Sequence, residues 1–279
     1  MRILPWLAVA SVSLFAPVVA QAACADAPEA CRVDGGTYHV ILPESAGDAT
    51  PAIMFIHGWG SSGEGVLGNT GLVNAVLARG YAIIAPDGMP REGASGRTWS
   101  FNPNRPERRD ESVFITAVRD DAVARHGIDA ERTILAGFSI GGSMVSYLAC
   151  QEPESFPAYA PVGGGFWRPH PTGCTGPVRL LHTHGWTDGT VPLEGRVLRG
   201  ESLEDPNALA QGDIFHTMLL WREVNGCTNL RATDFEMTEA FWHRRWTKCA
   251  EDTALELVLF PGGHSVPRGW ADMAIDWFE

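Results

Sequence analysis

Short apolar runs and amphipathic stretches alternate along most of this chain. Runs of apolar residues, typical of buried strands, occupy residues 37–42, 52–56, 81–85, 133–137, 159–162, 178–182 and 255–260. Apolar residues at helical spacing predict helices over residues 72–78, 110–126, 140–150, 213–225 and 270–278. Strands that alternate with helices in this order predict an α/β fold, with a mostly parallel central sheet and helices on both faces.

Two long segments lack such a pattern. Residues 89–110 are polar, with several glycines, prolines and arginines, and residues 187–212 are also rich in loop-forming residues. Both are expected to be surface loops. The chain has no internal repeat, low-complexity tract or linker, so residues 23–279 are expected to form a single domain.

The first residues have the pattern of a secretory signal peptide. Arg2 precedes an apolar run over residues 3–19, and two small residues flank a glutamine at positions 20–22. This pattern predicts a signal peptide over residues 1–22, cleaved after Ala22, and a secreted or periplasmic mature protein. A transmembrane anchor is the alternative, but Pro5 and Pro17 interrupt the run, which is short for a membrane span.

Composition and charge narrow the classes of partner. Hydrophobic residues make up 45% of the chain, which is enough for a sizeable core. The formal net charge is −12 and the sequence has no basic patch, which argues against nucleic acid as a partner. No later stretch is long and apolar enough to span a bilayer, so no membrane contact is expected for the mature protein. The oligomeric state stays open.

All six cysteines follow the expected cleavage site. An even number of cysteines in an exported chain indicates disulfides. Sequence alone does not choose the connectivity, although the spacing suggests that neighbours pair in order, as Cys24–Cys31, Cys150–Cys174 and Cys227–Cys249. Metal binding is an alternative, which the lack of a Cys-x-x-Cys pair disfavours. A lipid anchor on Cys24 is disfavoured because the usual leading aliphatic residue is missing before it.

The strongest chemical signal is Gly137-Phe138-Ser139-Ile140-Gly141, which lies between an expected strand and an expected helix. This is the context of a nucleophile elbow, a tight turn that lifts a serine hydroxyl above the edge of a sheet. The two glycines are small enough to flank such a turn, and the helix N-terminus that follows favours negative charge. We therefore expect Ser139 to be a nucleophile, with a purely structural serine as the alternative.

Two later residues could activate this serine. His264 follows the last expected strand, where the same fold places its general base, and it would take the serine proton and hand it to a leaving alcohol. Asp188 follows the strand 178–182 and would hold the imidazole in the correct tautomer. Asp87 also follows a strand, but it precedes the serine, which is the wrong order. A loop histidine without a role and a turn-forming aspartate are the alternatives.

Main-chain donors and aromatic side chains are expected around the nucleophile. The N–H groups of Ile140 and Trp59 are the expected oxyanion hole. His57 is expected to support the loop that carries Trp59. Trp59, Trp99 and Trp186 fall in loops near the expected site, where they would form an apolar wall of the substrate pocket, with ordinary packing as the alternative.

His182 and His184 form a competing signal. Alternate residues of a strand share a face, so the two imidazoles could bind a metal. No third ligand is evident nearby in the sequence, and His184 is expected instead to shape the turn beneath Asp188. Neither a metal nor a cofactor is expected.

The chain resembles the exported polyhydroxybutyrate depolymerase and feruloyl esterase-type α/β-hydrolases of bacteria over nearly all of residues 23–279. The matching motifs are His57-Gly58, Tyr81-x-x-x-Ala85-Pro86-Asp87, Asp110-Glu111-Ser112-Val113-Phe114-Ile115, Arg132-Thr133-Ile134-Leu135-Ala136-Gly137-Phe138-Ser139, Ala160-Pro161-Val162, His184-Gly185-Trp186-Thr187-Asp188 and Gly262-Gly263-His264-Ser265. The resemblance implies an α/β-hydrolase fold and cofactor-free cleavage of carboxylic esters through an acyl-enzyme on Ser139, with Asp188 and His264. The paired cysteines also fall where members of this family place theirs.

Two features depart from the family pattern. Ile140 replaces an asparagine found in many members, which changes the polarity of the pocket but not a backbone donor. No separate polymer-binding module is evident, so small or oligomeric esters are the expected substrates rather than crystalline polymer. A peptidase or an acyltransferase with the same triad, and a non-catalytic binding protein on a hydrolase scaffold, are the rival functions.

Overall fold

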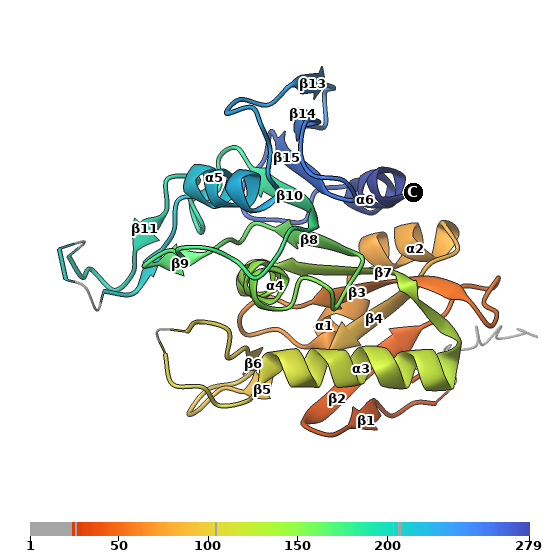
Figure 1. The fold of residues 1–279 in the computed structure, drawn as a ribbon. Helices are drawn as coiled ribbons and strands as arrows, with labels where there is room; N and C mark the ends of the chain where they lie inside the picture. Colours follow the sequence, from red (N-terminus) through yellow and green to blue (C-terminus); the bar gives the residue numbers. More distant parts are fainter. Residues whose placement is uncertain (1–23, 26, 104, 203, 206–207) are drawn as a thin grey trace, which may run out of the picture.

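The structure is a computed structural model that describes residues 24–25, 27–103, 105–202, 204–205 and 208–279 (Figure 1). The expected signal peptide, residues 1–22, lies outside the described residues. Among the helices of the described ranges, none combines the length and the apolar character needed to cross a bilayer.

A ten-stranded sheet forms the centre of the fold, in the order β1-β2-β4-β3-β7-β8-β10-β15-β14-β13. Its strands are β1 Cys31–Val33, β2 Gly36–Ile41, β3 Thr50–Ile56, β4 Ala82–Pro86, β7 Ile128–Phe138, β8 Ala158–Val162, β10 Arg179–Gly185, β13 Asp234–Met237, β14 Trp242–Trp246 and β15 Ala254–Phe260. The strands from β4 to β15 in this order pair in parallel, whereas the pairs at the two edges are antiparallel. The expected, mostly parallel sheet is therefore confirmed.

Helices cover both faces of the sheet, as expected (Figure 1). They are α1 Gly63–Leu67, α2 Thr70–Ala78, α3 Glu111–His126, α4 Ile140–Gln151, α5 Ile214–Val224 and α6 Trp270–Phe278. Side chains alternate between the faces along β3: Ile53 packs with α1, α2 and α6, whereas Met54 packs with α3, α4 and α5. Burial on both sides explains why β3 is continuously apolar in the sequence.

The edge strands β13 and β14 were not predicted. Strand β14 has the sequence Trp-His-Arg-Arg-Trp, which lacks the apolar alternation of a half-buried strand. The structure gives these charges partners instead: Arg245 bonds to Asp234 over 3.0 Å, to Glu236 over 2.8 Å and to the buried Glu256 of β15 over 3.0 Å. Carboxylates of the neighbouring strands therefore pair with Arg245 of β14. The periodicity of the sequence does not reveal such a charged strand.

The two expected surface loops contain short ladders. Within residues 89–110, β5 (Met89–Pro90) pairs with β6 (Arg97–Thr98). The second excursion includes β9 (Trp167–Arg168), β11 (Arg196–Val197) and β12 (Ala210–Gln211), which form a small sheet of their own. Figure 1 shows β5, β6, β9 and β11 on the left side of the view.

Three disulfides join neighbouring cysteines in order, as the spacing suggested. Their Cα–Cα distances are 5.0 Å for Cys24–Cys31, 4.5 Å for Cys150–Cys174 and 3.7 Å for Cys227–Cys249. The second ties the C-terminal end of α4 to the chain before β10, and the third ties the chain after α5 to the chain before β15. Each bridge closes a short loop, which restricts the unfolded chain more than the folded one.

Candidate active site

A sharp turn between β7 and α4 carries Ser139. This residue occupies the single position between the two elements and has φ 61° and ψ −123°. Positive φ is strained for a residue with a side chain, and such strain is common at catalytic turns. The neighbouring glycines are required by close approach: a Cβ at Gly137 would lie 2.6 Å from the carbonyl oxygen of Gly141, and a Cβ at Gly141 would clash with that of Ile56.

The side chains of Ser139, His264 and Asp188 form one continuous hydrogen-bonded chain. The hydroxyl Oγ of Ser139 lies 2.9 Å from Nε2 of His264, and Nδ1 of the same ring lies 2.7 Å from Oδ2 of Asp188. When Nδ1 carries the ring proton and donates a hydrogen bond to the carboxylate, Nε2 is unprotonated and its lone pair faces the hydroxyl. The arrangement can therefore move a proton from the serine to the imidazole.

Neighbouring strands bring the aspartate and the histidine together. Strands β10 and β15 pair in parallel up to Gly185 and Phe260, the last residues of each. Beyond the strands, the N–H of Thr187 donates to the carbonyl of Gly262 over 2.9 Å. The pairing thus continues into the two loops, which fixes the side chains that leave them above the same edge of the sheet.

Main-chain donors hold the carboxylate of Asp188 in place. Its Oδ1 accepts hydrogen bonds from the N–H groups of Thr190 and Val191, each over 2.8 Å, while Oδ2 faces His264. Burial by itself raises the pKa of this carboxyl, but the hydrogen bonds from His264, Val191 and Thr190 outweigh it, and the pKa is lowered. Asp188 is therefore ionised when the imidazole needs a negative partner.

The imidazole of His184 supports the turn that carries Asp188. His184 is fully buried, and its Nε2–H donates to the carbonyl of Val191 over 2.8 Å, with Oδ2 of Asp188 at 3.6 Å. Its Nδ1 accepts from Nε2–H of His182 over 3.1 Å. Burial lowers the pKa of both rings, so they are neutral in the folded protein. Both nitrogens of His184 are thus occupied, and the imidazole shapes the turn beneath Asp188 as expected.

Among the described residues, one cluster of side chains has the spacing of a metal site. This cluster does not include His182 or His184. It consists of Cys24, Cys31 and His126, whose two sulfurs are joined in a disulfide and are not thiolates. Nε2 of His182 and Nδ1 of His184 hydrogen-bond to each other.

The loop after β3 lies against Ser139. A Cβ built on Gly58 would lie 3.4 Å from Cβ of Ser139. The N–H groups of Trp59 and Ile140 donate no hydrogen bond to any acceptor among the described residues. Two unengaged donors therefore flank the serine, one from this loop and one from the start of α4.

His57 and Trp99 fix that loop from within the protein. Nδ1–H of His57 donates to the carbonyl of Gly58 over 2.8 Å, and Nε2 accepts from the N–H of Gly88 over 3.0 Å. The indole N–H of Trp99 donates to the carbonyl of His57 over 2.9 Å. Burial lowers the pKa of His57 to about 4, which keeps the ring neutral and able to accept the Gly88 bond.

Asp87, the other carboxylate that follows a strand, has a structural environment. Its Oδ1 accepts from the N–H of Gly63 at the start of α1 over 2.9 Å, and its Oδ2 accepts from Thr37 over 2.7 Å. Burial raises its pKa, but hydrogen bonds from His39, Gly63 and Thr37 outweigh this and lower the pKa to about 2. Asp87 fixes the packing of α1 on the sheet.

A cavity of about 400 Å³ opens beside Ser139 and His264. Ser139 and His264 line it together with Trp59, and its remaining wall is mostly apolar side chains: Phe55, Val66, Leu72, Phe138 and Val266. This wall was not predicted from the sequence, because apolar residues give the same pattern whether they face the core or a cavity. The N-cap pattern at Ser62 is the signal that would have located α1.

The three expected pocket tryptophans separate in space. Trp59 lines the cavity at Ser139, with the guanidinium of Arg91 3.6 Å above its ring. Trp99 is buried and lines a neighbouring hollow that also contacts Trp59. Trp186 lines neither; its exposed ring meets the edge of Trp242 at 6.0 Å between centroids.

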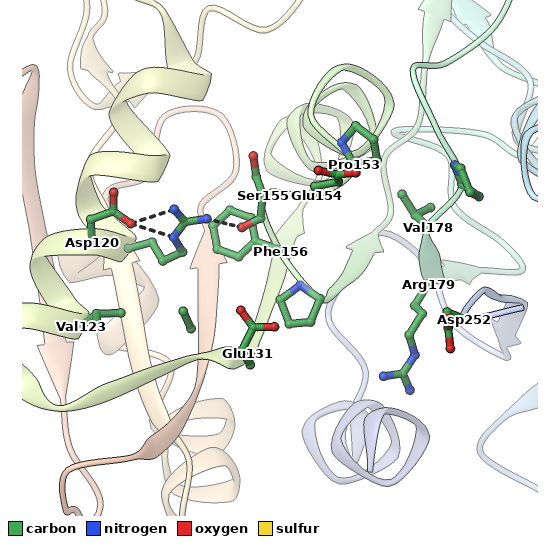
Figure 2. A pocket seen from close by; sticks show the side chains of 14 residues that line it. Asp120, Val123, Glu131, Pro153, Glu154, Ser155, Phe156, Val178, Arg179 and Asp252 are labelled. Atoms are coloured by element: carbon green, nitrogen blue, oxygen red, sulfur yellow. Dashed lines mark hydrogen bonds and ion pairs between the residues drawn. The ribbon is translucent and has the colours of Figure 1, made fainter.

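A further hollow of about 660 Å³ lies at the opposite edge of the sheet (Figure 2). In its wall, Val178 directly precedes β10 and Asp252 lies two residues before β15, whereas Asp188 and His264 follow the carboxyl ends of these strands. Figure 2 shows carboxylates such as Asp120 around it, and none of its described lining residues is a histidine or a cysteine. In α/β sheets, ligands bind at the carboxyl ends of the strands, which favours the cavity at Ser139.

Comparison with known proteins places the chain in a family. Residues 38–219, most of the chain, match the family described as phospholipase/carboxylesterase. The chain belongs to this family. The α/β-hydrolase fold of the described residues agrees with this membership, and esterases are among the relatives of the chain.

Several individual relatives carry the name of an esterase. The chain is 30% identical over 141 residues to feruloyl esterase C of Emericella nidulans, covering 49% of this chain and 47% of that protein. It is 24% identical over 157 residues to the bifunctional acetylxylan esterase/xylanase XynS20E of Neocallimastix patriciarum, covering 55% and 22%. The chain thus spans less than half the length of these curated relatives.

Solved structures agree with the fold. The acetyl xylan esterase of Aspergillus awamori superimposes with a TM-score of 0.63 at 17% identity, covering 88% of this chain and 94% of that one. At this identity the likeness concerns the fold. The feruloyl esterase part of the expected resemblance is confirmed for this carboxylesterase-family chain, and the polyhydroxybutyrate depolymerase part stays a prediction.

Proposed function

We propose that this chain is an exported serine esterase that hydrolyses small or oligomeric carboxylic esters through an acyl-enzyme on Ser139. The observation that supports it most is the hydrogen-bonded chain from Ser139 through His264 to Asp188, at 2.9 and 2.7 Å, beside an open cavity. Such an arrangement on unrelated folds serves nucleophilic attack on acyl groups.

The first half of the reaction acylates the serine. Oγ of Ser139 attacks the ester carbonyl carbon while its proton passes to Nε2 of His264. The N–H groups of Trp59 and Ile140 stabilise the oxyanion of the tetrahedral intermediate. When the intermediate collapses, His264 returns the proton to the departing alkoxide oxygen, and the alcohol leaves.

The second half restores the enzyme. A water molecule loses a proton to His264 and attacks the acyl carbon, and the same two N–H groups hold the new oxyanion. Collapse returns the proton to Oγ of Ser139 and releases the carboxylic acid. Asp188 keeps its charge throughout and stabilises the imidazolium formed in each step. The cycle uses no metal or cofactor.

Export is part of the same proposal. Residues 1–22 serve as a signal peptide, and residues 23–279 form the single catalytic domain. Three disulfides support an oxidising compartment, outside the cell or in the periplasm. N-terminal sequencing of the exported protein should give Ala23 as the first residue, and an uncleaved chain would contradict this assignment.

Covalent labelling tests the nucleophile. An aryl phosphonate should label folded protein at Ser139, and Ser139→Ala should abolish both labelling and hydrolysis of acetyl, feruloyl and hydroxybutyrate esters. Ser155→Ala is the matched control because Ser155 lies at the opposite edge of the sheet, and it should retain both. Hydrolysis by folded Ser139→Ala at the wild-type rate would refute the proposal.

A further inference from the structure

A second hollow adjoins the cavity at the catalytic serine. It has a volume of about 710 Å³ and shares Trp59 with the smaller cavity. Its wall also contains Ile140, the residue next to the nucleophile. The two hollows therefore meet at Trp59, close to Ser139.

Two segments that are far apart in the sequence build this hollow. Arg105 and Arg108 belong to the excursion over residues 89–110, and Arg199 belongs to the excursion that carries β9, β11 and β12. Both excursions project from the same side of the sheet in Figure 1. Each segment also contributes a buried tryptophan to the core, Trp99 from the first and Trp167 from the second.

The inner wall is aromatic and rigid. Trp99 and Trp167 are 5% and 7% exposed. Their indole N–H groups are both engaged, that of Trp99 with the carbonyl of His57 over 2.9 Å and that of Trp167 with Oγ of Ser143 over 3.2 Å. Both rings are thus fixed, and the part of each that lines the hollow is apolar, which suits a flat apolar body.

The outer rim is cationic in an otherwise acidic chain. The net charge of the chain is −12, yet three arginines and one glutamate, Glu92, line the hollow. Arg108 lies 3.5 Å from Glu92. Arg105 and Arg199 are exposed, and neither has an ion-pair partner within the described ranges. The two guanidinium groups are therefore available to bind an anion. The planar arrangement of N–H donors in each guanidinium matches the two oxygens of a carboxylate.

The proton path decides which part of an ester reaches this hollow. His264 must give its proton to the leaving oxygen, so the alcohol departs on the side of the imidazole. His264 lines the 400 Å³ cavity and not the arginine-rimmed hollow. The acyl group therefore extends the other way, past Ile140 and Trp59.

We propose that the hollow between Arg105 and Arg199 is an acyl-side subsite for aromatic acids that bear a second, anionic group. This inference rests on the proposed esterase function. The substrate class is the monoester of an aromatic dicarboxylic acid: its ring lies on Trp99 and Trp167, and its free carboxylate meets the two guanidiniums.

Matched ester pairs test the assignment. Ethyl 4-carboxybenzoate and ethyl 4-methylbenzoate differ in charge on the acyl side, and 4-carboxybenzyl acetate and 4-methylbenzyl acetate differ on the alcohol side. Wild-type kcat/KM should favour the anionic ester in the first pair only, and added salt should weaken that preference. A charge preference in the second pair alone would overturn the acyl-side assignment.

Substitutions test whether Arg105 and Arg199 bind the carboxylate. Arg105→Gln and Arg199→Gln should each lower kcat/KM for ethyl 4-carboxybenzoate by about fivefold, and the double variant by about tenfold or more. Values for ethyl 4-methylbenzoate should stay within about twofold. Arg32→Gln, which removes the same charge from an exposed position of β1, is the control. Equal losses on both esters, or the same loss in the Arg32 variant, would overturn the proposal.

A binding measurement separates this inference from the esterase proposal. Ethyl 4-carboxybenzoate should quench the tryptophan fluorescence of Ser139→Ala more strongly than ethyl 4-methylbenzoate at equal concentration, and Arg105→Gln/Arg199→Gln should remove the difference. If the wild type hydrolyses no ester while this difference persists, the esterase proposal fails and the anion subsite stands. If both esters bind alike to Ser139→Ala, the subsite is refuted whatever the turnover.

Discussion

Asp188→Asn tests the proton relay most directly, because the surroundings of the carboxylate dictate how the amide must lie. Oδ1 accepts from the N–H groups of Thr190 and Val191, each at 2.8 Å, so the amide oxygen must take that side. The amide NH₂ then replaces Oδ2, 2.7 Å from Nδ1 of His264. The reverse orientation would set a donor against two backbone donors and is excluded by the cost of unsatisfied N–H groups.

This orientation forces the wrong tautomer on the imidazole. An amide that donates to Nδ1 of His264 leaves the ring proton on Nε2, which then cannot accept the proton of Ser139. Loss of the correct tautomer in a serine triad lowers kcat by about 10⁴, equivalent to about 5 kcal/mol of transition-state stabilisation. KM should change little, since Asp188 is buried and does not line the substrate cavity.

The assay compares kcat for 4-nitrophenyl acetate between the wild type and folded Asp188→Asn, with thermal unfolding measured in parallel. Asp110→Asn is the matched control: it removes a carboxylate that caps α3, where asparagine caps equally well, and it should keep wild-type kcat. A folded Asp188→Asn enzyme that keeps more than about a tenth of wild-type kcat would refute the relay, because a correct tautomer would then not depend on this residue.

Three further predictions concern stability and support of the site. His57 has a pKa of about 4 in the folded protein against 6.5 in the unfolded chain, so between these values the unfolded chain binds one more proton. The free energy of unfolding should therefore fall by about 2–3 kcal/mol between pH 6.5 and 4.5. Urea titrations of His57→Gln should show a correspondingly smaller fall, and a fall equal to that of the wild type would contradict this. Replacing Cys227 and Cys249 by serine opens a bridge of sequence separation 22 and should cost about 3 kcal/mol in denaturant unfolding, so an unchanged midpoint would be inconsistent with the bridge. His184→Phe leaves the carbonyl of Val191 without its donor and should lower stability by about 1–3 kcal/mol and kcat by about tenfold, whereas unchanged kcat would show that the turn holds itself.

Local chemistry made much of this protein predictable from its sequence. The strands from β3 to β15 that are buried on both faces appear as continuous apolar runs, and the helices between them show their own period, so the parallel sheet follows from the pattern. Ser139 could be identified because its turn demands glycine on both sides within five residues. His264 and Asp188 could be proposed because parallel strands end at one edge, which brings distant loops together in a fixed order.

The remaining features depend on contacts between segments that sequence order does not relate. Strand β14 is charged throughout its centre, and only the carboxylates of β13 and β15 explain why Arg245 lies in a sheet. Trp186 precedes Asp188 by two residues, yet its ring turns toward Trp242 and away from the cavity.

The arginines at positions 105 and 199 are unremarkable in their own loops, and only the tertiary structure sets them around one hollow. Periodicity and turn chemistry act over a few residues, so the sequence by itself determined the buried strands, most of the helices and the candidate nucleophile. The tertiary structure alone decided which strands pair at the sheet edges, where loop side chains point and which charges surround a cavity. Each of these depends on residues that are far apart in the sequence.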